Sequence, residues 1–264
     1  MRALFTLRNI HTDESASIIA SAFTSRSVLL KHELAYVLGQ MTRKCSVQDL
    51  LSVLKNEDED EIVRHEAAEA LGNYRDKEHI EVLELFLGHQ SAPLRETCAL
   101  AIQKILDDPR QDVSAFMSKD PAYPAQTTLE DACESFTDSS CSLYKRYEAM
   151  FFLRDLMTDS AVNTLVKGFN DSSVLFKHEV AFVLGQMRIA VAVPHLIRVL
   201  QDSSEHAMVR HECAEALGAI GTKEARDALV PFLESSIDVI RESAEVALDI
   251  HMHGARDEGE YCFV

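Results

Sequence analysis

The sequence predicts an all-α protein, an α-solenoid of helical hairpins in two pseudo-twofold-related arms. Three observations lead to this prediction. The residues KHELAYVLGQM at 31–41 return almost unchanged as KHEVAFVLGQM at 177–187, an offset of 146 residues. Each half contains a finer repeat of about 33 residues, in which helix-period segments alternate with short polar breaks. No segment shows sustained two-residue alternation of β-branched residues, so we expect essentially no sheet.

The offset of 146 residues holds without a gap along most of the chain, which identifies the protein as a duplication. Three further pairs of segments obey this offset: FTLRNI at 5–10 and FFLRDL at 151–156, VQDLLSVL at 47–54 and VPHLIRVL at 193–200, and LRETCALAI at 94–102 and IRESAEVAL at 240–248.

The helices of the first half can be placed in order. Residues 13–42 contain two helical segments, DESASIIASAF and SVLLKHELAYVLGQM. The clearest repeat unit follows as VRHEAAEALGNYRDKE at 63–78, and its twin in the second half is VRHECAEALGAIGTKE at 209–224. A weaker unit occurs at 94–105. Helices joined by short turns and stacked in series form an α-solenoid.

We expect an N-terminal arm at 1–106, a linker at 107–127, a C-terminal arm at 128–252 and a tail at 253–264. The linker is polar and contains three of the six prolines. A segment of about twenty residues without secondary structure is unusual inside a compact domain and more often joins two domains.

The first repeat of the N-terminal arm is expected to be incomplete. Under the offset, Met1 pairs with Tyr147, so the first half has no counterpart of the helices expected at 128–136 and 142–150. Terminal repeats cap the apolar end of a solenoid. We therefore predict lower stability or a missing N-terminal segment, with the candidate site residues intact, and a higher melting temperature for a chain extended by an N-terminal helix.

Composition excludes several functional classes. The formal net charge of −17 argues against a broad basic surface for nucleic acid or anionic lipid, although it would suit a cationic partner or simply favour solubility. The sequence contains no run of eighteen or more apolar residues, so we expect no segment that spans a membrane. The six cysteines form no Cys-x-x-Cys pair and no export signal is visible, so we expect reduced thiols in a cytoplasmic protein.

The dipeptide His-Glu is the strongest candidate for a functional motif. It occurs four times, at His32-Glu33, His65-Glu66, His178-Glu179 and His211-Glu212, with a separation of 33 residues inside each half. One apolar stripe of the helix expected at 27–41 is formed by Leu30, Leu34, Val37, Leu38 and Met41. At 100° per residue, His32 lies about 160° from Leu34 and so nearly opposite this stripe. One such histidine is usually a solvated surface residue, but four in one register indicate a shared role. Because a solenoid stacks equivalent positions of neighbouring repeats, we expect His32 beside His65 and His178 beside His211.

A glycine follows each of these histidines by seven residues, at Gly39, Gly72, Gly185 and Gly218. Glycine inside a helix costs about 1 kcal/mol relative to alanine. We expect some of these glycines to end their helices, and the small residues to keep the histidine side uncrowded.

Four imidazoles and four carboxylates, with no thiolate, form a nitrogen and oxygen ligand set that suits iron, manganese or zinc. Zinc needs only three or four ligands and could be bound by one half. Two equal halves instead favour a dinuclear site at a pseudo-twofold axis, with open positions as in non-haem iron sites that handle oxygen. The residues alone do not separate iron from manganese.

The four motifs carry two resemblances. The repeats are similar to short HEAT-like repeats with a V-R-x-x-A-x-x-A-L-G core. KHELAYVLGQM, VRHEAAEALG, KHEVAFVLGQM and VRHECAEALGAI resemble the deoxyhypusine hydroxylase family over nearly the whole chain. This resemblance implies two four-repeat arms around two Fe²⁺ ions, with O₂ as co-substrate. It implies hydroxylation of the deoxyhypusine side chain of translation initiation factor five A to hypusine by a monomeric enzyme that binds no nucleic acid and no membrane.

The resemblance also assigns roles to individual residues. His32, His65 and Glu66 would hold one iron, and His178, His211 and Glu212 the other. Glu33 and Glu179 match catalytic positions, engaged with substrate or with metal. The substrate side chain is a cationic polyamine, which a cleft lined by carboxylates would attract. Glu69 and Glu215 follow His65 and His211 by four residues, so they are candidates to receive imidazole N–H groups or to face the substrate.

Two other functional classes remain open from the residues. One is a non-catalytic HEAT-repeat scaffold with a structural metal, and the other is a metal-dependent hydrolase. Metal content would separate the three classes, because two irons per chain favour the oxygenase, no metal favours the scaffold, and zinc or manganese without oxygen consumption favours the hydrolase.

Overall fold

The structure of this chain, a computed structural model, describes residues 1–107, 116 and 118–254. These residues form α-helices and short 3₁₀ turns, and no β-strand occurs among them. The prediction of an all-α fold is therefore confirmed for this part of the chain. The structure divides into two compact units, Met1–Tyr123 and Pro124–Val264.

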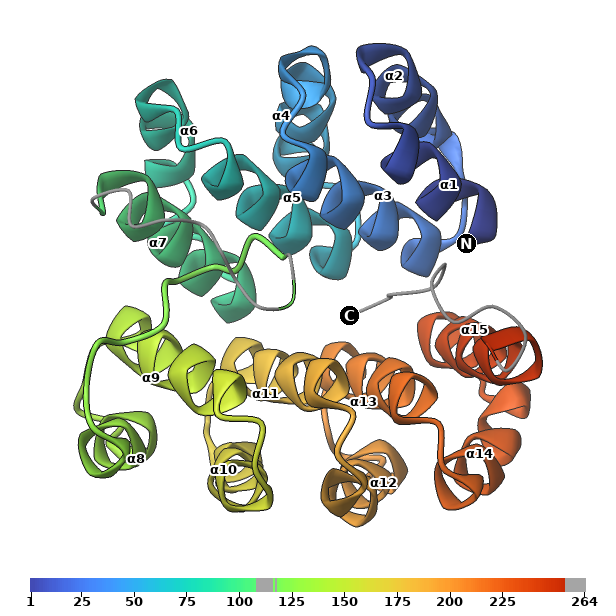
Figure 1. The fold of residues 1–264 in the computed structure, drawn as a ribbon. Helices are drawn as coiled ribbons and strands as arrows, with labels where there is room; N and C mark the ends of the chain where they lie inside the picture. Colours follow the sequence, from blue (N-terminus) through green and yellow to red (C-terminus); the bar gives the residue numbers. More distant parts are fainter. Residues whose placement is uncertain (108–115, 117, 255–264) are drawn as a thin grey trace. The chain divides into compact units, whose positions relative to one another are not determined.

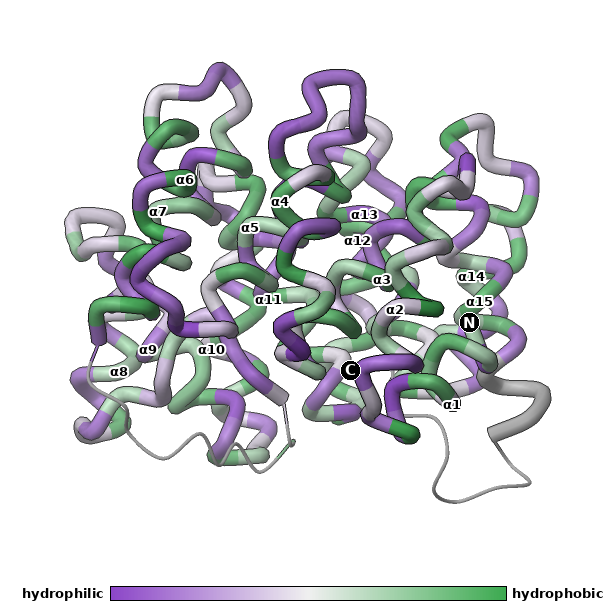
Figure 2. Tube along the Cα trace, turned by 90° about the horizontal axis from the view of Figure 1, so that it is seen from above, coloured by the Kyte–Doolittle hydropathy of each residue, from purple (hydrophilic) through white to green (hydrophobic). Residues whose placement is uncertain are grey.

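The first unit stacks its helices in two rows (Figure 1). Helices α3, α5 and α7 pack side by side in an inner row, which α1 extends beside α3, while α2, α4 and α6 form the outer row. The helices of this unit are α1 (Arg2–Ile10), α2 (Asp13–Ser21), α3 (Val28–Met41), α4 (Val47–Lys55), α5 (Glu61–Asn73), α6 (Ile80–Glu84) and α7 (Ala92–Leu106). The turn between α4 and α5 is strongly hydrophilic (Figure 2).

The second unit repeats this arrangement with four hairpins (Figure 1). Its inner row contains α9, α11, α13 and α15, each packed on the next, and its outer row contains α8, α10, α12 and α14. The helices are α8 (Leu129–Thr137), α9 (Leu143–Asp155), α10 (Asp159–Leu165), α11 (Val174–Met187), α12 (Val193–Gln201), α13 (Ala207–Ile220), α14 (Lys223–Leu229) and α15 (Asp238–Gly254).

A buried arginine joins the two helices of a hairpin at three equivalent positions. Its Nε donates a hydrogen bond to the carbonyl near the end of the preceding outer helix, in the pairs Arg64–Leu54 (3.0 Å), Arg146–Phe136 (3.2 Å) and Arg210–Leu200 (2.9 Å). These bonds satisfy carbonyl groups that a helix end leaves without intrahelical partners, and they fix the inner helix against its outer partner.

The structure corrects the prediction that glycines end the His-Glu helices. Each helix continues past its glycine, and α3, for example, runs two residues beyond Gly39 to Met41. Three of these glycines lie instead where the next inner helix approaches. A Cβ added at Gly39 would lie 2.8 Å from Cα of Ala70, and the Gly72 and Gly218 backbones meet Ala101 and Ala247 in the same way. The small residues therefore permit close packing between inner helices.

The predicted linker at 107–127 contains the boundary between the units, which falls after Tyr123. Residues 108–115 and 117 of it lie outside the described residues, as does most of the tail predicted at 253–264. Residues 118–123 pack against the first unit, where Lys119 N–H donates to Oε1 of Gln40 (2.7 Å) and Arg75 stacks over the ring of Tyr123. The ammonium of buried Lys104 donates to the Asp120 carbonyl. This polar segment thus belongs to the first unit.

No helix within the described residues combines the length and the apolar composition that a membrane crossing requires.

Candidate metal centre

The caps of four inner helices position the four His-Glu pairs identically. The N-cap residues are Ser27, Asp60, Ser173 and His206, and each accepts a hydrogen bond from a backbone N–H of the first turn through its side chain. The histidine of each pair is the fifth residue after its cap. The shared start of the helices therefore gives each histidine the same height along its helix, so that histidines of neighbouring inner helices lie side by side.

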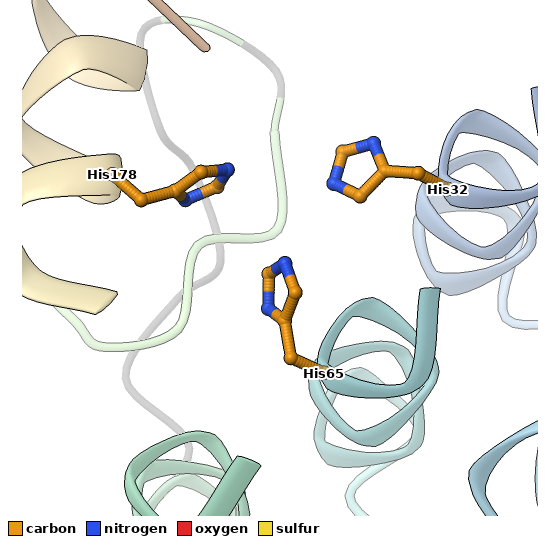
Figure 3. A group of neighbouring side chains, drawn as sticks. All are labelled: His32, His65 and His178. Atoms are coloured by element: carbon orange, nitrogen blue, oxygen red, sulfur yellow. The ribbon is translucent and has the colours of Figure 1, made fainter. Parts of the chain in front are cut away.

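In the first unit, His32 and Glu33 come from α3, and His65 and Glu66 come from α5. Figure 3 shows the rings of His32 and His65 projecting toward a common space from neighbouring helices, with ring centroids 5.7 Å apart. Nδ1 of His32 lies 3.2 Å from Oε1 of Glu33, and its Nε2 lies 3.4 Å from Oε2 of Glu66. The predicted proximity of the two histidines is confirmed.

All four of these side chains are buried, with at most 4% of each residue exposed. Burial by itself lowers the pKa of His32, but the hydrogen bonds and negative charges of Glu33 and Glu66 outweigh it and raise that pKa well above 6.5. The carboxylates thus create a site that favours a positive charge in the interior of the unit.

Glu69, four residues after His65 on α5, is half-buried beside the same cluster. Single ligand atoms of His65, Glu66 and Glu69 lie within 4.8 Å of one another. Burial, and then the negative charge of Glu66, raise the pKa of Glu69 well above 4.5, while the ammonium of Lys104 opposes the shift. Glu69 was predicted as a supporting residue, and its position makes it an additional possible metal ligand.

The second unit builds the same arrangement from α11 and α13. The rings of His178 and His211 have centroids 5.5 Å apart, and Nε2 of His178 lies 3.2 Å from Oε2 of Glu212. Ligand atoms of these three residues lie within 4.8 Å of one another, and all three are buried. Glu179, the remaining residue of the pair on α11, is 3% exposed. Figure 3 draws His178 as it leaves α11.

Glu215 occupies the position in α13 that Glu69 occupies in α5. Its Oε1 lies 3.7 Å from Nδ1 of His211 and accepts a hydrogen bond of 3.1 Å from the hydroxyl of Ser243 on α15. This places a carboxylate, itself held by a hydroxyl, beside the imidazole nitrogen. A carboxylate that accepts the imidazole N–H orients a histidine ring and increases its basicity, and whether Glu215 has this role or faces the substrate stays a prediction.

The residues fit a transition-metal ion in each unit. Two ligand atoms bound at about 2.1 Å to one ion lie at most about 4.2 Å apart, so a set within 4.8 Å needs only small side-chain shifts. The donors are imidazole nitrogens and carboxylate oxygens in buried surroundings, which suit iron, zinc or manganese. In the first unit His32 joins the set through its contact with Glu66.

Sequence reasoning missed two ion pairs next to the clusters. Lys31 pairs with Glu59, and Lys177 pairs with Glu205 at 2.5 Å between Nζ and Oε2. All four residues obey the offset of 146 that identified the histidines, so the duplication itself contained the signal. A lysine directly before a histidine reads as ordinary helix surface, which explains why the pairs were not recognised.

Comparisons with known proteins agree with the repeats and with the site. A family model described as HEAT repeats matches residues 15–103, 46–130 and 144–249. Deoxyhypusine hydroxylase of Candida albicans is 44% identical over 100% of this chain and 89% of that protein, and the Danio rerio enzyme is 41% identical over 94% of this chain and 85% of its own length. The structure of human deoxyhypusine hydroxylase in complex with glycerol superimposes with a TM-score of 0.92 at 41% identity, and the match covers 96% of this chain and 89% of that one.

Proposed function

The chain belongs to the deoxyhypusine hydroxylase family, and from this premise we propose that it is a monooxygenase that hydroxylates the deoxyhypusine side chain of translation initiation factor five A to hypusine. The observation that supports the proposal most directly is the pair of buried His-Glu clusters in a chain 40–44% identical to enzymes of this name. Relatives with this name also favour catalysis over the alternative of a scaffold with a structural metal.

We assign one iron ion to each unit. His32, His65 and Glu66 would hold the iron of the first unit, and His178, His211 and Glu212 that of the second. The second set has its ligand atoms within 4.8 Å, and the first repeats its residue types at equivalent helix positions. Bound Fe²⁺ would supply the redox chemistry by which O₂ delivers one oxygen atom into a C–H bond.

Glu33 and Glu179 act on the substrate in this proposal. Each follows a metal-binding histidine directly and is at most 4% exposed. The deoxyhypusine side chain carries amine groups that are cationic at neutral pH, and a buried carboxylate attracts and orients such a group more strongly than one in water. Burial also excludes water from the histidines and carboxylates. The net charge of −17 favours the approach of a cationic side chain.

The experiment combines metal analysis with a hydroxylation assay on the purified chain. We expect two irons per chain and conversion of deoxyhypusine to hypusine in the translation factor. His178→Ala should lower iron to one per chain and abolish conversion, whereas His195→Ala, a half-buried histidine of α12 outside the clusters, should change neither. Glu179→Gln should keep both irons and lose conversion.

Several results would contradict the proposal. A chain that purifies with no iron and gains none on incubation with Fe²⁺, or one that contains iron but leaves the factor unmodified under O₂ and a reductant, would refute the activity. Retention of two irons in His178→Ala would refute the ligand assignment alone. The monomeric state and the cytoplasmic location stay predictions, which sizing chromatography and localisation of the tagged chain would test.

A further inference from the structure

The two half-buried ion pairs beside the clusters connect the helices that carry the histidines. Lys31 lies on α3 directly before His32, and its ammonium contacts Oε1 of Glu59 in the turn that precedes α5. Lys177 lies on α11 directly before His178, and its ammonium contacts Glu205 in the turn before α13. Their side chains are only 10–14% exposed, so water screens these pairs less than it screens ordinary surface pairs.

The carboxylate of each pair makes a second contact that extends the connection. Oε1 of Glu59 also accepts a hydrogen bond of 2.9 Å from the backbone N–H of Asp60, the N-cap residue of α5. Oε1 of Glu205 accepts one of 2.7 Å from the N–H of His206, the N-cap of α13. In the first unit, the Glu59 carboxylate therefore joins Lys31, which precedes His32, to Asp60, the N-cap of the helix that carries His65. Glu205 joins Lys177 to His206 in the same way in the second unit.

The duplication gives this arrangement twice, once in each unit. In each copy the N-cap stands five residues before its histidine, so a shift of the cap along the helix axis moves that histidine by the same amount. A helix rises about 1.5 Å per residue. A slip of even part of one residue would exceed the tolerance within which a metal ligand has to be held.

We propose that Lys31 with Glu59, and Lys177 with Glu205, are positioning residues that set the relative height of the two histidines in each metal site. The inference rests on the proposed function, because it assumes one iron in each unit. The residues act through the helices and contact neither iron nor substrate. Removal of one lysine should therefore weaken iron binding in its own unit and leave the other unit unchanged.

The test measures the release of iron from the holoprotein to a chelator. Lys31→Met should speed the release of one of the two equivalents about tenfold, the lower end of the effect of residues that support metal ligands. Lys177→Met should do the same for the other equivalent, and the double variant should affect both. Lys31→Arg, which keeps the charge and a donor, should release iron like the original protein.

The control is Lys223→Met, because Lys223 pairs with Asp227 on an exposed face of α14 away from the clusters, with side chains 82% and 59% exposed. It should leave both release phases unchanged. In the iron-free protein, Lys31→Met should speed amide hydrogen exchange over residues 57–66 and leave 203–212 unchanged, and Lys177→Met should do the reverse. This second measurement does not depend on iron.

Iron release at the original rate in both single variants would overturn the inference while the proposed function stood. Faster release of both equivalents by either single variant, or no recovery with Lys31→Arg, would also overturn it, since a general loss of stability rather than local positioning would then be responsible. Absence of iron from the unmodified chain would instead contradict the proposed function, and the exchange measurement would still decide whether the pairs hold the helix starts.

Discussion

Replacement of Gly39 by alanine should destabilise the first unit and disturb its His-Glu cluster, although alanine is the better helix former. Gly39 lies inside α3, where a Cβ would come within 2.8 Å of both Cα and Cβ of Ala70 on α5. Ordinary contacts begin near 3.4 Å, so the helices would have to separate by roughly 0.6 Å at this point. Cα of Ala70 belongs to the backbone of a buried helix and its Cβ is fixed to that backbone, so neither atom can rotate away.

The magnitude follows from two opposed effects. Alanine gains about 1 kcal/mol in helix propensity over glycine, and overpacking of a close-packed core costs about 1–3 kcal/mol. The contact with rigid backbone favours the upper part of that range, so we expect a net loss of about 1–2 kcal/mol. For a chain of this size each kcal/mol changes the melting temperature by roughly 2–4 °C, which predicts a fall of roughly 2–8 °C.

Differential scanning calorimetry of the iron-free protein tests this expectation, with iron content as a second readout. The matched control is Gly88→Ala, because Gly88 is exposed and a Cβ added there would have no atom within 4 Å apart from those of its chain neighbours. The control should melt within about a degree of the original. An unchanged or higher melting temperature for Gly39→Ala would refute the reasoning, since α3 and α5 would then separate without cost.

Three further predictions address other contacts. Arg210→Met removes the guanidinium bond to the carbonyl at the end of α12, and urea unfolding should show a loss of about 1.5–3 kcal/mol. Lys104→Met should loosen residues 118–123, so that limited proteolysis cuts there faster than in the original chain while α7 stays folded. Burial raises the pKa of the Cys98 thiol to about 12, so at pH 8 this thiol stays protonated and unreactive; a thiol reagent should label exposed Cys45 quickly and Cys98 only after unfolding.

The sequence was sufficient for the fold class and for the residues of each cluster because both depend on the repeat. His32 and His65 lie 33 residues apart, and a solenoid places such positions beside each other, as their ring separation of 5.7 Å shows. The expectation that some of the four glycines end their helices was wrong for a physical reason, which Gly39 illustrates. Glycine reads as a helix end in a single sequence, but here its missing Cβ serves the approach of another helix, which no local pattern records.

Residues 118–123 illustrate a second limit of sequence reasoning. Proline and polar residues predict a linker, and the contacts that bind this segment to the first unit join residues far apart in the chain. Lys119 meets Gln40 across 79 positions, through one amide side chain with no periodic signal. Contacts of this kind follow from the folded arrangement, so the sequence could place the segment between repeats but could not attach it to one of them.

The burial of the two His-Glu clusters does not by itself stabilise the iron-free fold. An imidazole and a carboxylate in a helical interior lose hydration, and such a pair is often no more stable than apolar residues of the same volume. His65 and His211 have no exposed surface, yet the aligned positions of both units keep histidine and glutamate where alanine or leucine would pack well. Stability of the iron-free fold does not account for two such clusters with equal spacing. The cation proposed for each unit would account for them, because it would compensate the negative charge of carboxylates such as Glu33 and Glu66, which raise the pKa of His32.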